Sequence, residues 1–266
     1  MSNIKNLFQG LDKIGFNNTE NISIYKKATI KKTETKKTAN KIIDPSTLLF
    51  DRTIDCPVCH TNFKTPSVKK EGYKIDKRDS DSFIYYKDIN PYLYDIILCP
   101  KCGYAALKND FSKLRNYQRI HVIKNITPKY ISKEYPRLLD INSAIERYKL
   151  ALLNSVYIDS AASTKAILCL RLGWLYRLTK SYDNENLFLS KAVEGLEFAY
   201  TNESFPIYGM DSYSLEYLIG ELYRRIGNFD ASLKWFSSLI VKTGVDPKLK
   251  EKSRCQRDLA KNSIKK

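Results

Sequence analysis

Cys56-Pro57-Val58-Cys59 and Cys99-Pro100-Lys101-Cys102 are two copies of a CPxC motif, and the predicted fold depends on them. In each copy a tight turn brings two thiolates to one point, so that the two copies together offer four. Four thiolates suit a tetrahedral zinc ion with no open coordination position. We therefore predict one structural Zn²⁺ ion bound by Cys56, Cys59, Cys99 and Cys102. Iron in the same site and a redox switch that releases zinc on oxidation are alternatives that the sequence leaves open.

The residues around the four cysteines favour a structural site over a catalytic one. Proline after the first cysteine of each motif fixes φ, and Gly103 permits the positive φ that turns backbone N–H groups towards sulfur. His60 stands in the corresponding place of the first motif. It is not a predicted ligand, because a histidine directly after a ligating cysteine would need a different loop. A closed tetrathiolate site cannot activate water, and the HxE motif of zinc deaminases is missing.

Composition places the chain among globular proteins. It has 266 residues, of which 43% are hydrophobic, and six cysteines. No apolar stretch is long enough to span a membrane, and the N-terminus lacks a signal-peptide pattern. We therefore expect a cytoplasmic protein in which Cys169 and Cys255 are ordinary thiols.

The formal net charge of +16 allows two interpretations. A strongly basic chain is typical of nucleic-acid binding. However, only 12 of the 45 basic residues are Arg, and the chain is rich in residues with AT-rich codons, which favours a solvated lysine surface. Nucleic acid therefore remains the alternative partner.

The chain divides into three predicted regions. Residues 1–48 are expected to be a disordered, Lys-rich segment, in which Ile4, Leu7, Phe8, Leu11 and Ile14 can form a short amphipathic helix. Residues 49–108 are expected to form a zinc-ribbon-like domain with one small antiparallel sheet. Its predicted strands are 68–77, 82–86 and 92–98.

Residues 109–266 are predicted to form an all-α domain, so that the fold class is α+β. Apolar residues recur there with a helical period, and Asp110 is a candidate cap for the first helix. The predicted helices are 110–125, 140–156, 162–180, 185–201, 211–226, 229–242 and a basic C-terminal helix, 247–262.

The helical half contains an internal repeat. Leu172-Gly173-Trp174-Leu175-Tyr176-Arg177 matches Ile219-Gly220-Glu221-Leu222-Tyr223-Arg224, 47 residues later. Small and large apolar residues at these positions allow paired helices to pack closely and then to stack. Residues 140–245 thus resemble degenerate tetratricopeptide repeats, although their spacing exceeds the usual length. The resemblance implies a scaffold that binds a protein or peptide partner.

A second candidate functional cluster lies between two predicted strands. Arg78, Asp79 and Asp81 could bind a cation or serve an enzyme, whereas turn formation explains the same residue types equally well. The sequence contains no phosphate-binding loop, dinucleotide-binding glycine motif or GxSxG motif. We predict neither catalytic nor organic-cofactor-binding residues.

The chain as a whole resembles a family of uncharacterised bacterial proteins, in which paired CPxC knuckles precede tetratricopeptide-like helices. The likeness spans about residues 49–245 and includes Asn90-Pro91-Tyr92-Leu93-Tyr94-Asp95 and Lys77-Arg78-Asp79-Ser80-Asp81 besides the knuckles. It implies zinc binding and a cytoplasmic bacterial protein, and it implies no reaction.

Three functions follow as hypotheses. The first is a non-enzymatic zinc-binding adaptor whose helical repeats bind a protein. The second is a nucleic-acid-binding protein that uses the zinc ribbon and the Lys-rich ends. The third is an enzyme with a site near Arg78, Asp79 and Asp81. The sequence favours the first of these and a non-enzymatic role.

Overall fold

The computed structural model describes residues 10–15 and 44–265. The predicted disordered segment therefore lies mainly outside the described residues, as do Ile4, Leu7 and Phe8 of the predicted amphipathic helix. Residues Leu11–Ile14 form a 3₁₀ helix in which Ile14 is fully buried.

Contacts divide the described residues into two compact units. The first unit contains residues 10–15, 44–78 and 84–160, and the second contains residues 79–83 and 161–265. The helices of residues 116–157 thus belong to the same unit as the strands. The division into domains predicted from the sequence places its boundary after residue 108, and it stays a prediction.

The first unit contains three short antiparallel strand pairs. Each CPxC motif forms the loop of a hairpin: the first joins β1 to β2, and the second joins β5 to β6. The strands are β1 (Leu49–Asp55), β2 (Asn62–Val68), β3 (Ile75–Arg78), β4 (Ile84–Tyr86), β5 (Ile96–Leu98) and β6 (Ala105–Leu107). Instead of the single predicted sheet, these strands form three separate two-stranded ladders.

The strand predicted at 92–98 is wrong in its first half. Residues Pro91–Tyr94 form a 3₁₀ helix, and β5 begins only at Ile96. The Asn90 side chain accepts a hydrogen bond from the Tyr92 N–H at 3.0 Å. Proline at the first helical position then favours this turn over an extended chain.

Two helices complete the first unit, α1 (Asn116–Asn125) and α2 (Ile141–Tyr157). The helix predicted to start at Asp110 starts later. Asp110 precedes a short 3₁₀ helix, Phe111–Lys113, and its side chain pairs with Lys113 at 3.0 Å and caps no α-helix. Instead, the Gln118 side chain accepts from the Arg115 N–H at 3.1 Å. Helix α2 is apolar along most of its length and packs on β5 and β6.

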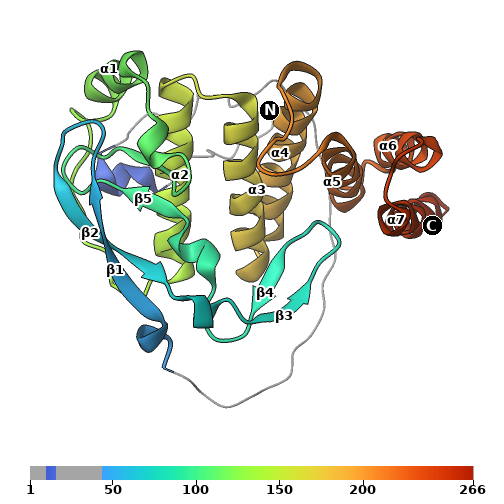
Figure 1. Cartoon of the computed structure of the whole chain (residues 1–266), viewed down its shortest axis with the longest axis horizontal. Helices are drawn as coiled ribbons and strands as arrows, with labels where there is room; N and C mark the ends of the chain where they lie inside the picture. Colours follow the sequence, from blue (N-terminus) through green and yellow to red (C-terminus); the bar gives the residue numbers. More distant parts are fainter. Residues whose placement is uncertain (1–9, 16–43, 266) are drawn as a thin grey trace. The chain divides into compact units, whose positions relative to one another are not determined.

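The second unit is helical, and consecutive helices pack against one another (Figure 1). The helices are α3 (Ala162–Leu178), α4 (Tyr182–Asn202), α5 (Ser212–Arg225), α6 (Phe229–Val241) and α7 (Pro247–Ile264). The predicted cap of the last helix is confirmed, since Asp246 accepts from the Leu249 N–H at 3.2 Å. The fold is therefore α+β, with strands concentrated before residue 108 and helices after it. In the described ranges no helix has the length and apolar character that a membrane crossing requires.

Candidate metal centre

The two CPxC loops have the same backbone structure. The His60 N–H donates to the Cys56 carbonyl at 3.0 Å, and the Gly103 N–H donates to the Cys99 carbonyl at 3.1 Å. His60 and Gly103 both have a left-handed backbone, with φ of 58° and 73°. The loops are therefore equivalent although one of these positions is not glycine. His60 itself is exposed and lies outside the cysteine cluster.

Close packing against Tyr130 favours glycine at position 103, in addition to its positive φ. A Cβ atom at this position would lie 2.4 Å from Cγ of Tyr130, well inside van der Waals contact. The tyrosine ring thus covers the second loop from outside, and any side chain at 103 would displace it.

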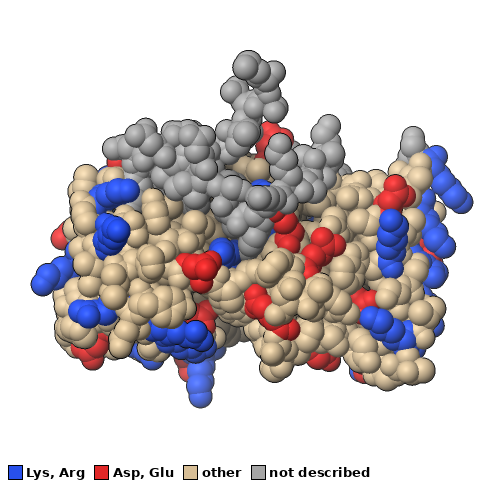
Figure 2. Space-filling view, turned by 90° about the horizontal axis from the view of Figure 1, so that it is seen from above, with Lys and Arg blue, Asp and Glu red and all other residues tan. Residues whose placement is uncertain are grey.

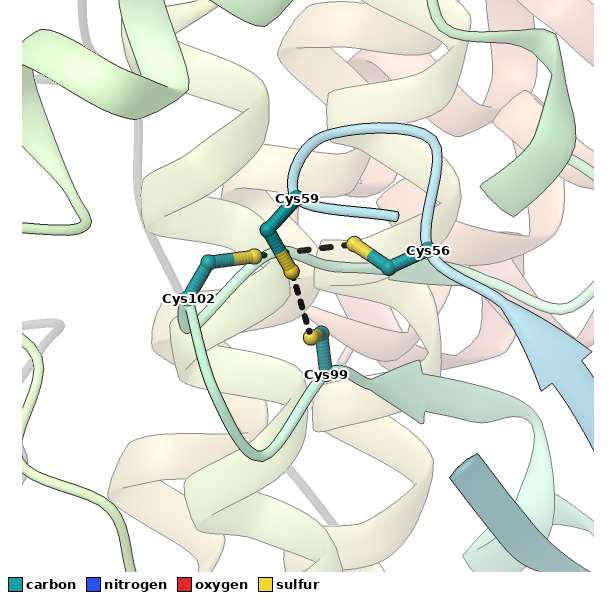
Figure 3. A group of neighbouring side chains, drawn as sticks. All are labelled: Cys56, Cys59, Cys99 and Cys102. Carbon is teal, nitrogen blue, oxygen red and sulfur yellow. Dashed lines mark hydrogen bonds between the residues drawn. The ribbon is translucent and has the colours of Figure 1, made fainter. Parts of the chain in front are cut away.

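The loops bring Cys56, Cys59, Cys99 and Cys102 together, as the sequence predicts (Figure 3). The four Sγ atoms lie within 4.8 Å of one another. The Cys56–Cys102 and Cys59–Cys99 sulfur pairs are each 3.6 Å apart, and all four cysteines are free thiols. A tetrahedral ion with metal–sulfur bonds of about 2.3 Å holds its sulfurs about 3.8 Å apart. The cluster therefore has the geometry to hold one metal ion and is too open for disulfides.

The thiols are not equivalent in their acidity. Interaction with the neighbouring Cys102 and Cys56 thiols lowers the pKa of Cys99. The pKa of Cys102 is raised by the neighbouring Cys56 and Cys99 thiols and by burial. The thiols therefore share protons, and a divalent cation that binds them must displace those protons.

Three side chains from outside the loops hold the loop carbonyls. Arg119 Nε on α1 donates to the Val58 carbonyl at 2.8 Å. Thr127 Oγ1 donates to the Cys102 carbonyl at 3.1 Å, and Asn154 Nδ2 on α2 donates to the Gly103 carbonyl at 3.2 Å. None of these three contacts was predicted from the sequence. Of the three residues, only Asn154 could have been suspected from the sequence, because it is a polar residue on the apolar face of a predicted helix.

The other predicted cluster is divided between the two units. Arg78 is exposed on β3 in the first unit, whereas Asp79 and Asp81 belong to the helical unit. There, Arg177 Nη1 donates to Asp79 Oδ2 at 2.8 Å and Nη2 to Asp81 Oδ2 at 2.6 Å. Trp174 Nε1 also donates to Asp81 Oδ2, at 3.0 Å.

Asp81 is fully buried, and its charge is well compensated. Burial opposes its ionisation, but the charges of Arg177 and Arg225 outweigh burial and lower the pKa of Asp81 to about 2. Arg177 Nε donates in addition to Glu185, at 2.8 Å. An ionised carboxylate that is paired in this way stabilises the helical unit and is a poor proton donor at neutral pH.

The residue between the two aspartates is also held from the helices. Ser80 Oγ donates to Glu221 Oε1 at 2.5 Å, and the Ser80 carbonyl accepts from the Tyr217 hydroxyl at 3.0 Å. Glu221 accepts in turn from Arg224 at 2.7 Å and from Arg225 at 2.9 Å. The short segment 79–83 is thus fixed by side chains of α3 and α5.

Fold and site together define an α+β protein with a cluster of four cysteines that could hold a metal ion. The chain belongs to the family described as "Uncharacterized protein conserved in bacteria (DUF2225)", whose sequence profile matches residues 49–260. An uncharacterized protein of Borreliella burgdorferi is 26% identical over 152 residues, which cover 50% of this chain and 54% of that protein. The match thus spans about half the length of this curated relative. No solved structure matches the chain.

Proposed function

We propose that the chain is a non-enzymatic adaptor, in which one structural zinc ion stabilises the first unit and the helical unit binds a segment of a protein partner. The main observation behind this proposal is that the four cysteine thiols lie close enough together to bind one ion. Zinc fits four thiolates in a tetrahedron, and such an ion has no position left for a substrate or for water. A cytoplasmic location follows from reduced thiols in this proposal.

Support for an adaptor comes from the repeated packing of the helical unit. Gly173 on α3 faces Leu189 of α4, where a Cβ would approach to 2.7 Å. Gly220 on α5, 47 residues later, faces Phe236 of α6, where a Cβ would approach to 3.0 Å. Glycine at equivalent places lets both helix pairs pack closely, as in the tetratricopeptide repeats that the sequence resembles. Such pairs present exposed surfaces for protein segments.

Exposed apolar side chains of the helical unit are the proposed contacts. Phe198 on α4 is 58% exposed and Val241 on α6 is 78% exposed. The test is affinity purification of the chain from its native extract, with Phe198→Ser and Val241→Ser as variants and Ile75→Ser in the first unit as the matched control. The adaptor proposal expects a stoichiometric protein that both helical variants lose and the control retains. Equal recovery with all variants, or no such protein, would contradict it.

Nucleic-acid binding is the second candidate, and helix α7 favours it. Lys and Arg gather at the right-hand end in Figure 2, where α6 and α7 lie. Lys250, Arg254, Arg257 and Lys261 follow each other at three- and four-residue intervals, so that they form one stripe. Retention on an RNA column that falls steeply with salt, and that Arg254→Glu weakens, would favour this candidate.

A further inference from the structure

Helix α1 buries little of its surface. Of its described residues only Val122 is buried. Tyr117 is 51% exposed, Ile120 63% and Ile123 44%. A single exposed apolar residue is ordinary, whereas a group of large ones marks a surface that meets something apolar.

These three side chains share one face of the helix. They follow each other at intervals of three residues, and in an α-helix that spacing places neighbours about one turn apart along the same side. The buried Val122 marks the side of α1 that packs inward, and Ile120, two residues earlier, lies on the opposite side. Arg119 lies at the edge of the apolar face, one turn before Ile123, and donates to the Val58 carbonyl of the first CPxC loop at 2.8 Å.

The sequence around this face is rich in basic residues. Residues 111–133 contain no Asp or Glu, and they contain six basic residues: Lys113, Arg115, Arg119, Lys124, Lys129 and Lys133. Among them Lys124 lies on the exposed side of α1, one turn beyond Ile120. Lys113 pairs with Asp110 at 3.0 Å and Lys133 with Glu146 at 2.6 Å. Arg115, Lys124 and Lys129 are the exposed basic residues that remain beside the apolar side chains, so that the surface is apolar and carries positive charge.

We propose that the exposed face of α1 docks on an anionic membrane surface, with Tyr117, Ile120 and Ile123 entering the headgroup region. An interfacial helix of this kind gains from apolar burial and from the attraction of Lys and Arg to acidic lipids. A nucleic acid would use the cationic edge only, since isoleucine neither stacks on a base nor binds a phosphate. This attachment is peripheral and does not depend on the adaptor proposal.

The test is co-sedimentation of the metal-loaded chain with phosphatidylcholine vesicles that contain about one-third phosphatidylglycerol, and with pure phosphatidylcholine vesicles. We expect binding to the acidic vesicles only. The double variant Ile120→Ser/Ile123→Ser should lose at least tenfold in affinity, and Val241→Ser, which removes a still more exposed apolar group on α6, should lose nothing. Lys124→Glu should lose about fivefold or more, because each basic residue near such a surface contributes about that factor.

Each remaining outcome overturns the proposal. Wild-type protein that stays in solution with acidic vesicles, or an isoleucine double variant that binds as wild type does, contradicts membrane docking. Binding to a duplex DNA or a single-stranded RNA that Lys124→Glu weakens and the isoleucine substitutions leave unchanged would assign the face to a nucleic acid. A dimer in sedimentation equilibrium that the isoleucine substitutions dissociate would assign it to a second copy. Unchanged metal content confirms that each variant is folded.

Discussion

Arg119 Nε lies 2.8 Å from the carbonyl oxygen of Val58, so that a helix is joined directly to the first metal-binding loop. The donor is charged and the acceptor lies between the two cysteines of the loop. Such a bond restricts how far Cys56 and Cys59 can separate, although it touches neither sulfur. Outer contacts of this kind commonly strengthen metal binding by a factor of ten or more.

Replacing Arg119 should therefore weaken the metal centre. We expect Arg119→Ala to release the ion to a chromophoric chelator about tenfold faster than wild type. Lys124→Ala, on the same helix but exposed, should leave the release rate unchanged. Equal rates for Arg119→Ala and wild type would show that the bond does not restrain the loop.

Gly103→Ala should be more harmful than a glycine substitution with the same backbone strain. Gly103 and Gly209 both have φ between 70° and 80°, but a Cβ at Gly209 meets nothing within 4 Å. Gly209→Ala should therefore cost about 1 kcal/mol, the usual penalty for a left-handed alanine. Gly103→Ala should cost about 2 kcal/mol more, because the methyl group displaces the Tyr130 ring. Urea unfolding followed by circular dichroism measures both, and similar midpoints for the two variants would argue against the ring contact.

The buried Asp81 predicts an acid-sensitive helical unit. Its pKa is lowered to about 2 in the folded chain, from an ordinary value of 3.8, so the unfolded chain binds the proton more tightly. The pairing thus contributes stability that is fully present above about pH 4 and is lost as the pH falls through 2. The contribution at neutral pH is about 2 kcal/mol.

Asp81→Asn should remove this pH dependence. We expect the variant to be less stable than wild type at pH 7 and its free energy of unfolding to change less between pH 4 and pH 2. Glu251→Gln, which alters an exposed carboxylate on α7, should leave the wild-type pH profile intact. A profile for Asp81→Asn that parallels wild type would mean that other carboxylates dominate acid unfolding.

Removal of the metal should loosen the first unit locally. After treatment with a chelator, amide hydrogen exchange should rise in residues 56–61, 99–104 and 116–125, because the loops lose their common ion and α1 loses its anchor on Val58. Exchange in α5 and α6 should change little, since both helices belong to the second unit, which contains none of the four cysteines. A uniform rise throughout the chain would contradict local stabilisation.

The metal cluster was predictable from sequence because CPxC loops are short and their geometry is local. The helices were predictable for a similar reason, as apolar periodicity and caps such as Asp246 are read within a few residues. The ion pairs of Asp79 and Asp81 with Arg177 were not predictable, because Arg177 lies nearly a hundred residues away in the sequence and only the packing of the helical unit brings it near. The strand expected at Tyr92 failed because Asn90 and Pro91 favour a turn over an extended chain. Nothing in the sequence around Arg119 predicts its hydrogen bond to the Val58 carbonyl.

Metal content of the purified chain tests the central proposal most directly. Elemental mass spectrometry should find one zinc per wild-type chain and one in Cys255→Ser, which alters an exposed cysteine outside the cluster. Cys99→Ser should lose the ion and unfold the β5–β6 hairpin. Iron in place of zinc would correct the identity of the metal. A wild-type chain purified without any metal, or a Cys99→Ser chain that keeps its full complement, would contradict the four-thiolate centre.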